Sequence, residues 1–151
     1  MEIKLYSALT PDEKENYVRQ MAGCDWDAGR YLAGVASDER LDETFGDGAR
    51  LLLLTENDTL CAYCTLVHTD EIESEDMHPW IGFVYTFPDF RGRRYSGILI
   101  EHAVTLAKND GEKNVYVSSE EKGLYEKYGF TFVRTMHSIH GYDTGVFIRR
   151  I

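Results

Sequence analysis

The stretch that decides the fold covers residues 86 to 97 and reads Thr86-Phe87-Pro88-Asp89-Phe90-Arg91-Gly92-Arg93-Arg94-Tyr95-Ser96-Gly97. A strand-like segment, Trp80 to Thr86, precedes it, and a segment with helical periodicity, Ser96 to Asn109, follows it. The stretch is therefore a tight basic turn between a strand and a helix N-terminus. Free backbone N–H groups and the positive end of the helix dipole converge there, which suits a phosphate or pyrophosphate. A basic surface turn without a ligand would contain the same residues.

A second segment downstream favours the ligand-binding interpretation of this turn over a plain surface turn. It reads Gly123-Leu124-Tyr125-Glu126-Lys127-Tyr128-Gly129-Phe130 and follows a predicted helix and a short strand. The two segments, in this order and at this spacing, resemble the acetyl-CoA-binding motif and the Leu-Tyr-Glu-Lys-Leu-Gly-Phe signature of the GNAT superfamily of N-acetyltransferases. Residues 1 to 75 resemble the family only in the order of strands and helices.

The resemblance implies an α/β (α+β) fold. We expect a mixed, mostly antiparallel central sheet of about seven strands flanked by about four helices, with splayed strands ending near Thr86 and Val117 that form the CoA cleft. The 151 residues suit one domain, so residues 1–151 are predicted to form a single unit. The periodicity predicts further strands and helices. The strands are Glu2 to Ser7, Arg50 to Thr55, Leu60 to His68, Val115 to Val117, Phe130 to Met136 and Gly145 to Ile151; the helices are Thr10 to Met21, Asp27 to Leu41 (Tyr31, Leu32 and Val35 on its apolar face) and Glu120 to Tyr128.

The resemblance also assigns roles to residues. Tyr125 matches the tyrosine that protonates, or hydrogen-bonds, the departing CoA thiolate; a buried packing tyrosine is the alternative. The positions matching the cofactor site are Val84, Tyr85, Thr86, Arg91, Gly92, Arg93, Arg94, Tyr95, Ser96, Gly97 and Ser119. Arg94 and Ser96 replace the two inner glycines of the family's turn, and Gly97 is expected to restore some of the lost backbone freedom.

The general base is not identified. The position where many relatives have a glutamate falls near Trp80, which cannot accept a proton. His78, Asp76, Glu71, Asp70 and water remain candidates.

The predicted function is acetyl transfer from acetyl-CoA to a primary amine by direct attack in a ternary complex, without a metal. Residues 1 to 76 have 18 acidic and 6 basic residues, which favours a cationic small molecule or a peptide amine as acceptor. Two alternatives stay open: a non-catalytic acyl-CoA-binding or regulatory module, and an interaction protein that presents Arg91 to Arg94 to an anionic partner. A homodimer through edge strands near the C-terminus is a further hypothesis.

Composition argues against other classes of protein, namely nucleic-acid-binding, membrane-spanning and zinc or redox proteins. The net charge of −10 argues against nonspecific binding to nucleic acid. No apolar run approaches the ~18 residues of a membrane span, and the cytoplasm is the expected location. Cys61 and Cys64 form a Cys-x-x-Cys pair. Because residues three apart on a strand point to opposite faces, we expect two core thiols, not a zinc or redox site.

Overall fold

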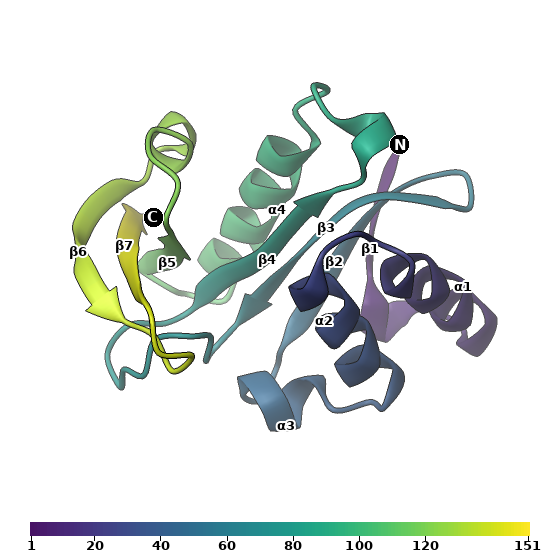
Figure 1. Ribbon diagram of the computed structural model, residues 1–151, viewed down its shortest axis with the longest axis horizontal. Coiled ribbons are helices and arrows are strands. Elements are labelled where there is room, and N and C mark those ends of the chain that lie inside the picture. Colours follow the sequence, from purple (N-terminus) through teal and green to yellow (C-terminus); the bar gives the residue numbers. More distant parts are fainter.

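A seven-stranded sheet forms the centre of the computed structural model, which describes residues 1–151 (Figure 1). The strand order is β1-β2-β3-β4-β5-β7-β6, and only β4 and β5 run parallel. The strands are β1 (Glu2–Leu5), β2 (Arg50–Glu56), β3 (Thr59–Val67), β4 (Trp80–Thr86), β5 (Asn114–Ser119), β6 (Thr131–His137) and β7 (Asp143–Arg150). The predicted mixed, mostly antiparallel sheet is confirmed.

Four α-helices cover the two faces of the sheet (Figure 1). They are α1 (Pro11–Ala22), α2 (Asp27–Ser37), α3 (Leu41–Phe45) and α4 (Tyr95–Asn109), with short 3₁₀ turns at Tyr6–Ala8, Pro88–Phe90 and Tyr125–Tyr128. The first three pack with one set of strand side chains into one core cluster, and α4 packs with the alternate set into a second. A sheet with both faces covered explains why strands such as Leu51 to Leu54 are apolar at every position.

The sheet opens between β4 and β5. Their pairing stops at Ile81 and Val117, so the rest of β4 has no partner on that side. β4 also has one more residue than the facing part of β3, which leaves Phe83 and Val84 in a bulge, and Phe83 has a φ of 49°. A bulge bends its strand and increases the local twist. This bend directs β4 away from β5 and produces the predicted splay.

Two predicted helices are shorter than expected. The helix from Asp27 ends at Ser37, because Glu39 adopts a φ of 56° before α3 begins. Tyr31, placed on the apolar face, is 56% exposed, so that prediction was wrong, whereas Leu32 is buried. In the predicted helix from Glu120 to Tyr128, only the turn Tyr125–Tyr128 is helical. Gly123, with a φ of 84°, interrupts the segment before it.

The two cysteines of the Cys-x-x-Cys pair lie on the same side of β3. A register shift opposite Leu54 and Thr55 leaves Cys61 without a facing residue on β2, so Cys61 and Cys64 both pack in the core cluster of α4. The prediction of opposite faces was therefore wrong, because it assumed a regular strand. Both thiols are buried and free. No group of three His, Cys, Asp or Glu side chains is arranged to hold a metal ion, and no helix has the length and apolar character needed to cross a membrane.

Candidate active site

The α4-side cavity, of about 460 Å³, lies where β4 ends and α4 begins. The basic turn and residues 121 to 128 form its other sides. Its lining residues are Val84, Tyr85, Thr86, Phe90, Arg91, Gly92, Arg94, Tyr95, Ser96, Ile100, Glu121, Leu124, Tyr125 and Tyr128. The structure thus brings Tyr125 together with most of the residues that were predicted to bind the cofactor.

Hydrogen bonds and backbone conformation fix the shape of the basic turn. Gly92 and Arg94 have φ values of 84° and 64°, in the left-handed region, and Arg94 is the N-cap residue of α4. Arg94 therefore occupies a position that favours glycine. Ser96 Oγ lies 3.0 Å from Thr86 Oγ1, and the Arg91 Nε–H donates to the Thr86 carbonyl at 3.0 Å. These bonds hold the turn against the end of β4.

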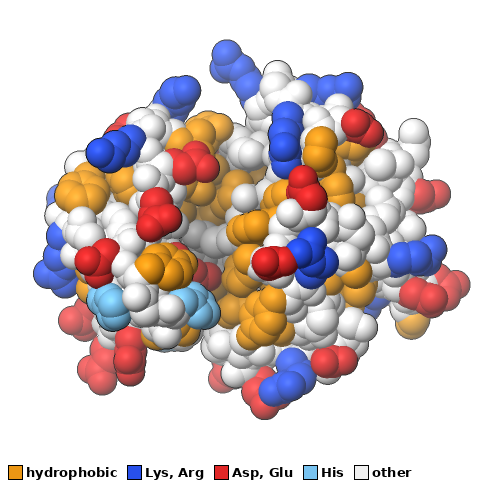
Figure 2. All heavy atoms as spheres, in the orientation of Figure 1, with side chains coloured by type: hydrophobic (Ala, Val, Ile, Leu, Met, Phe, Trp, Pro, Cys, Tyr) orange, Lys and Arg blue, Asp and Glu red, His pale blue; other side chains and the backbone are white.

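The three arginines of the turn differ in their surroundings. Arg91 lies over the ring of Tyr85, 5.6 Å from its centroid, and neither Arg91 nor Arg94 forms a salt bridge. Arg93 lies outside the lining, 3.9 Å from Glu56. Figure 2 shows a hollow with hydrophobic walls and with Lys and Arg side chains along its upper rim. Two guanidinium groups in the cavity are thus free to meet an anion.

Gly97 and Ser119 lie outside the lining of this cavity. Gly97 is in the first turn of α4, and a Cβ there would lie 2.8 Å from Tyr128 Cε1. Its lack of a side chain permits close packing, and the expectation that it frees the turn was wrong, because the positive φ values fall on Gly92 and Arg94. Ser119 ends β5, where its Oγ accepts the Glu121 N–H at 3.0 Å.

Tyr125 lines the α4-side cavity and is almost fully buried. The residue is 7% exposed, and its ring packs against Phe130 and Phe147 at centroid distances of 5.9 and 6.2 Å. Its hydroxyl forms no hydrogen bond within the chain. Burial raises the pKa of this phenol, and the negative charges of Glu121 and Asp70 raise it further. The group therefore keeps its proton at neutral pH and has no internal acceptor for it.

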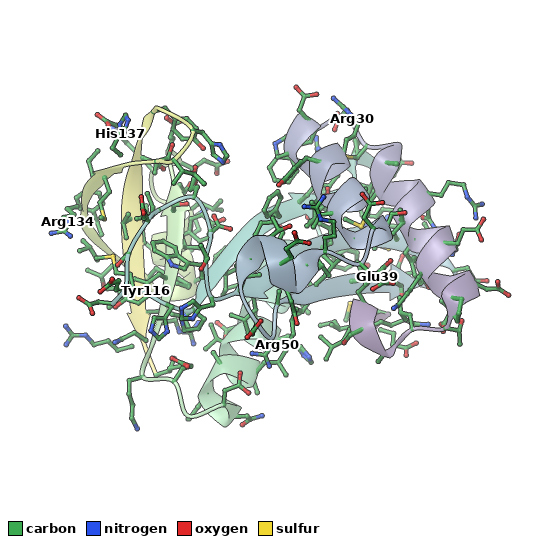
Figure 3. The ribbon with its side chains drawn as sticks, turned by 90° about the horizontal axis from the view of Figure 1, so that it is seen from below. Arg30, Glu39, Arg50, Tyr116, Arg134 and His137 are labelled. Atoms are coloured by element: carbon green, nitrogen blue, oxygen red, sulfur yellow. The ribbon has the colours of Figure 1, made fainter.

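The α2-side cavity, of about 510 Å³, lies on the other side of the β4 bulge. Its lining comes from the start of α2, from α3, from the loop after β3, from the β4 bulge and from the turn between β6 and β7. The lining residues are Trp26, Asp27, Ala28, Tyr31, Thr44, Phe45, Thr69, Asp70, Glu71, Phe83, Ile139, His140 and Tyr142. Figure 3 shows the two walls apart, with Arg30 on the α2 side and Arg134 and His137 on the β6 side.

Sequence reasoning found only Asp70 and Glu71 among these residues, and only as candidate bases. The aromatic residues come from segments that are distant in the chain and carry no motif.

The structure separates the candidate bases. His78 lies before β4, 4.0 Å from Glu112 and with its ring 4.3 Å from that of His68, in a hollow shared with neither cavity. Asp76 is exposed in the loop before it. Trp80 is buried, in line with its exclusion as a base.

Glu71 and Asp70 lie in the α2-side cavity but differ in their bonds. Both carboxylate oxygens of Glu71 accept hydrogen bonds, one from Ser118 Oγ and one from the Tyr142 hydroxyl. Asp70 Oδ1 is shielded from solvent and has no partner. It lies against β4, where a Cβ on Gly82 would be 2.6 Å from it. Burial, above all, raises the pKa of Asp70 to about 6.

Comparisons with known proteins agree with this geometry. The sequence profile of the Acetyltransferase (GNAT) family matches residues 10–130. A comparison with curated protein sequences gave no match. Among solved structures, aminoglycoside 6'-acetyltransferase type Ii is similar with a TM-score of 0.73 and 11% identity, over 99% of this chain and 97% of that one.

Two further structures have the same fold. An acyl-CoA N-acyltransferase from Pseudomonas aeruginosa gives a TM-score of 0.64 at 22% identity, over 99% of both chains. A GNAT family acetyltransferase from Elizabethkingia anophelis, solved with acetyl-CoA bound, gives 0.66 at 15% identity, over 99% of this chain and 97% of that one. With a family profile that covers most of the sequence and a shared fold over its whole length, this chain belongs to the GNAT family of acetyltransferases.

Proposed function

We propose that this acetyltransferase transfers the acetyl group of acetyl-CoA to a primary amine by direct attack in a ternary complex. The observation that carries the proposal is the position of Tyr125, whose unpartnered hydroxyl lies in the same cavity as the basic turn. The proposed cofactor-binding residues are Val84, Tyr85, Thr86, Arg91, Gly92, Arg93, Arg94, Tyr95, Ser96, Gly97 and Ser119.

The two ends of the α4-side cavity match the two ends of the cofactor. The pyrophosphate lies at the turn, where Arg91, Arg94 and the free N–H groups of α4 supply positive charge. The pantetheine arm follows the unpaired edge of β4 toward the bulge. The thioester then lies near Val84, whose backbone N–H polarises the carbonyl oxygen. Arg93, Gly97 and Ser119 support this site from outside the lining.

The chemical step needs two proton movements. The acceptor ammonium first loses a proton and becomes a neutral amine. Its lone pair attacks the thioester carbon, so a C–N bond forms and the C–S bond then breaks. The leaving sulfur keeps the bonding electrons and takes a proton from the Tyr125 hydroxyl, and the attacking nitrogen gives up its second proton to restore the phenol. The products are the N-acetyl amine, CoA thiol and one proton released to solvent.

A cationic acceptor, either a small molecule or a peptide amine, fits the charge around the second cavity. Asp27, Asp70 and Glu71 line the α2-side cavity, and no lysine or arginine lines it. Negative charge in a cavity with low-dielectric walls attracts a cation and raises its local concentration. The cytoplasm is the proposed location, and the exposed Phe132 and Val133 on the edge strand β6 support a homodimer.

Isothermal titration with acetyl-CoA, with CoA and with ATP as an anion control tests the cofactor assignment. We expect acetyl-CoA and CoA to bind, with ATP at least tenfold weaker. Thiol release in the presence of amines then tests the transfer. Equal binding of ATP, with a steep dependence on salt, would favour a general anion-binding surface instead.

A further inference from the structure

The α2-side cavity contains three carboxylates, but only one is free to bind a ligand. Asp27 forms an ion pair with Arg30, and both oxygens of Glu71 accept hydrogen bonds from the protein. Asp70 Oδ1 has no partner and is shielded from solvent. A buried carboxylate oxygen without a donor is costly unless a ligand supplies one. The cavity therefore has one place for one cation.

Most of the other lining residues are hydrophobic, and most of these are aromatic; the polar ones are Thr44, Thr69 and His140. Trp26 and Phe83 pack with ring centroids 6.0 Å apart, and Phe45 and Phe83 meet edge to face at 5.5 Å. These rings form one wall beside the β4 bulge. An aromatic wall favours a flat apolar group, by contact between rings and by burial of apolar surface.

The lining also includes hydrophobic side chains that the fold leaves exposed. Tyr31, Ile139 and Tyr142 are 56%, 62% and 43% exposed, and they are half of the six large hydrophobic residues exposed in the whole chain. All three line the α2-side cavity. Exposed apolar side chains gathered around one cavity mark a binding site.

Asp70 is also close to the reaction point. Its Oδ1 lies over Gly82, the residue before the β4 bulge, where the sheet opens between the two cavities. Its charge contributes to the raised pKa of Tyr125 on the other side of this opening. A proton acceptor and a proton donor thus flank the place where the thioester of the proposed function lies.

From these observations we infer that the acceptor is a primary amine on an apolar body of aromatic size, and that Asp70 binds its ammonium group and accepts its proton. The inference rests on the proposed function and specifies its acceptor. It separates such amines from polyamines, because a polyamine needs several free carboxylates and the cavity offers one. Asp70 passes the accepted proton to solvent, and the neutral amine attacks the thioester.

The charges that face Asp70 set its pH range. Burial and the neighbouring Glu71 raise its pKa to about 6, and the nearby His140 on the β6–β7 turn opposes this when charged. Asp70 is therefore ionised at pH 7.5 and protonated below pH 6. We expect kcat/KM for the amine to fall below pH 6, since a protonated Asp70 neither attracts the ammonium group nor takes its proton.

The test compares 2-phenylethylamine with spermidine and ethanolamine as acceptors. We expect kcat/KM for 2-phenylethylamine to be at least tenfold higher than for the other two. Tyr31→Ala should lower it about threefold to tenfold, whereas Lys108→Ala, an exposed residue on α4 outside both cavities, should leave it unchanged. Asp70→Asn should lower it about 100-fold at pH 7.5, remove the fall below pH 6 and leave the affinity for acetyl-CoA within twofold.

The outcomes separate this inference from the proposed function. Loss of acetyl-CoA binding in the unmodified chain would overturn the proposed function itself. Binding of acetyl-CoA with a preference for spermidine, or with no transfer to 2-phenylethylamine, would overturn the acceptor class alone. An Asp70→Asn variant that keeps the wild-type rate and pH profile would overturn the role of Asp70, whichever amine is preferred.

Discussion

The two cavities on either side of the β4 bulge are built in different ways. The α4-side cavity comes from two continuous stretches, residues 84 to 100 and 121 to 128, and most of its shape is set by backbone conformation and short-range hydrogen bonds. The α2-side cavity comes from five segments spread between residues 26 and 142, and side chains make its walls. The shape of the first cavity therefore depends on local sequence, and that of the second depends on contacts between distant segments.

The largest effect should come from removing the Tyr125 hydroxyl, which in the proposed function acts in the chemical step and does not contribute to the affinity for acetyl-CoA. Tyr125→Phe should lower kcat about 100-fold, because the leaving sulfur loses its proton donor. The affinity for acetyl-CoA, measured by titration, should stay within twofold, since the hydroxyl holds no other group in place.

Tyr116→Phe is the matched control for this variant. Tyr116 is also buried, packs 5.4 Å from Trp80 and donates no hydrogen bond from its hydroxyl, but it lines neither cavity (Figure 3). It should keep full activity. An unchanged kcat in Tyr125→Phe would leave a non-catalytic acyl-CoA-binding module as the better description.

The buried charge of Asp70 should lower the stability of the folded chain as well as support the proposed reaction. Its pKa is about 6 in the folded chain against 3.8 as a model value, so the folded state binds more protons than the unfolded state between about pH 4 and 6. Stability should fall as pH rises through this window. Asp70→Asn should therefore raise the free energy of unfolding at pH 7.5 by ~2–3 kcal/mol while it lowers activity.

Urea denaturation at pH 5 and pH 7.5 measures this effect. The control is Asp76→Asn, an exposed carboxylate six residues along the same loop, for which we expect a change below ~0.5 kcal/mol. If Asp70→Asn gained no more stability over the wild type at pH 7.5 than at pH 5, or were less stable than the wild type at pH 7.5, burial of the Asp70 charge would not destabilise the fold.

The close contact between Gly97 of α4 and Tyr128 allows a test of how the α4-side cavity is packed. Gly97→Ala places a Cβ 2.8 Å from Tyr128 Cε1, so the tyrosine ring must move although alanine favours the helix. We expect a loss of ~1–2 kcal/mol in the free energy of unfolding and weaker binding of acetyl-CoA. The double variant Gly97→Ala with Tyr128→Leu should recover most of both, because leucine vacates the space. Additive losses would mean that the contact does not limit the packing.

The smallest effect concerns Arg94. Its left-handed backbone conformation is costly for any residue with a Cβ, so Arg94→Gly should raise the free energy of unfolding by ~0.5–1 kcal/mol. The lost charge should weaken acetyl-CoA binding about threefold to tenfold. Arg94→Ala should show the weaker binding without the gain in stability. Unchanged affinity in both variants would remove Arg94 from the phosphate site.

The same contrast explains what the sequence could predict. The turn, the start of α4 and the position of Tyr125 follow from residues within a few positions of one another, so local patterns indicated them. Three features depended on long-range register: the bulge at Phe83, the irregular pairing that turns Cys61 toward Cys64, and the aromatic wall from Trp26 to Tyr142. Even Asp70 could not be chosen over Glu71 until the partners from β5 and the β6–β7 turn were in place.

Glu71 also determines how the β6–β7 turn is held over the α2-side cavity. Besides its two side-chain bonds, its carbonyl accepts the Ile139 N–H at 2.8 Å, so one residue fastens the β6–β7 turn over the α2-side cavity. The width of the cavity opening is therefore set by the bonds of Glu71 to this turn, and not by the hydrogen bonds between the strands of the sheet. A substitution at residue 71, or in the turn that it holds, should therefore change the width of this opening while the residues that line the α4-side cavity stay as they are.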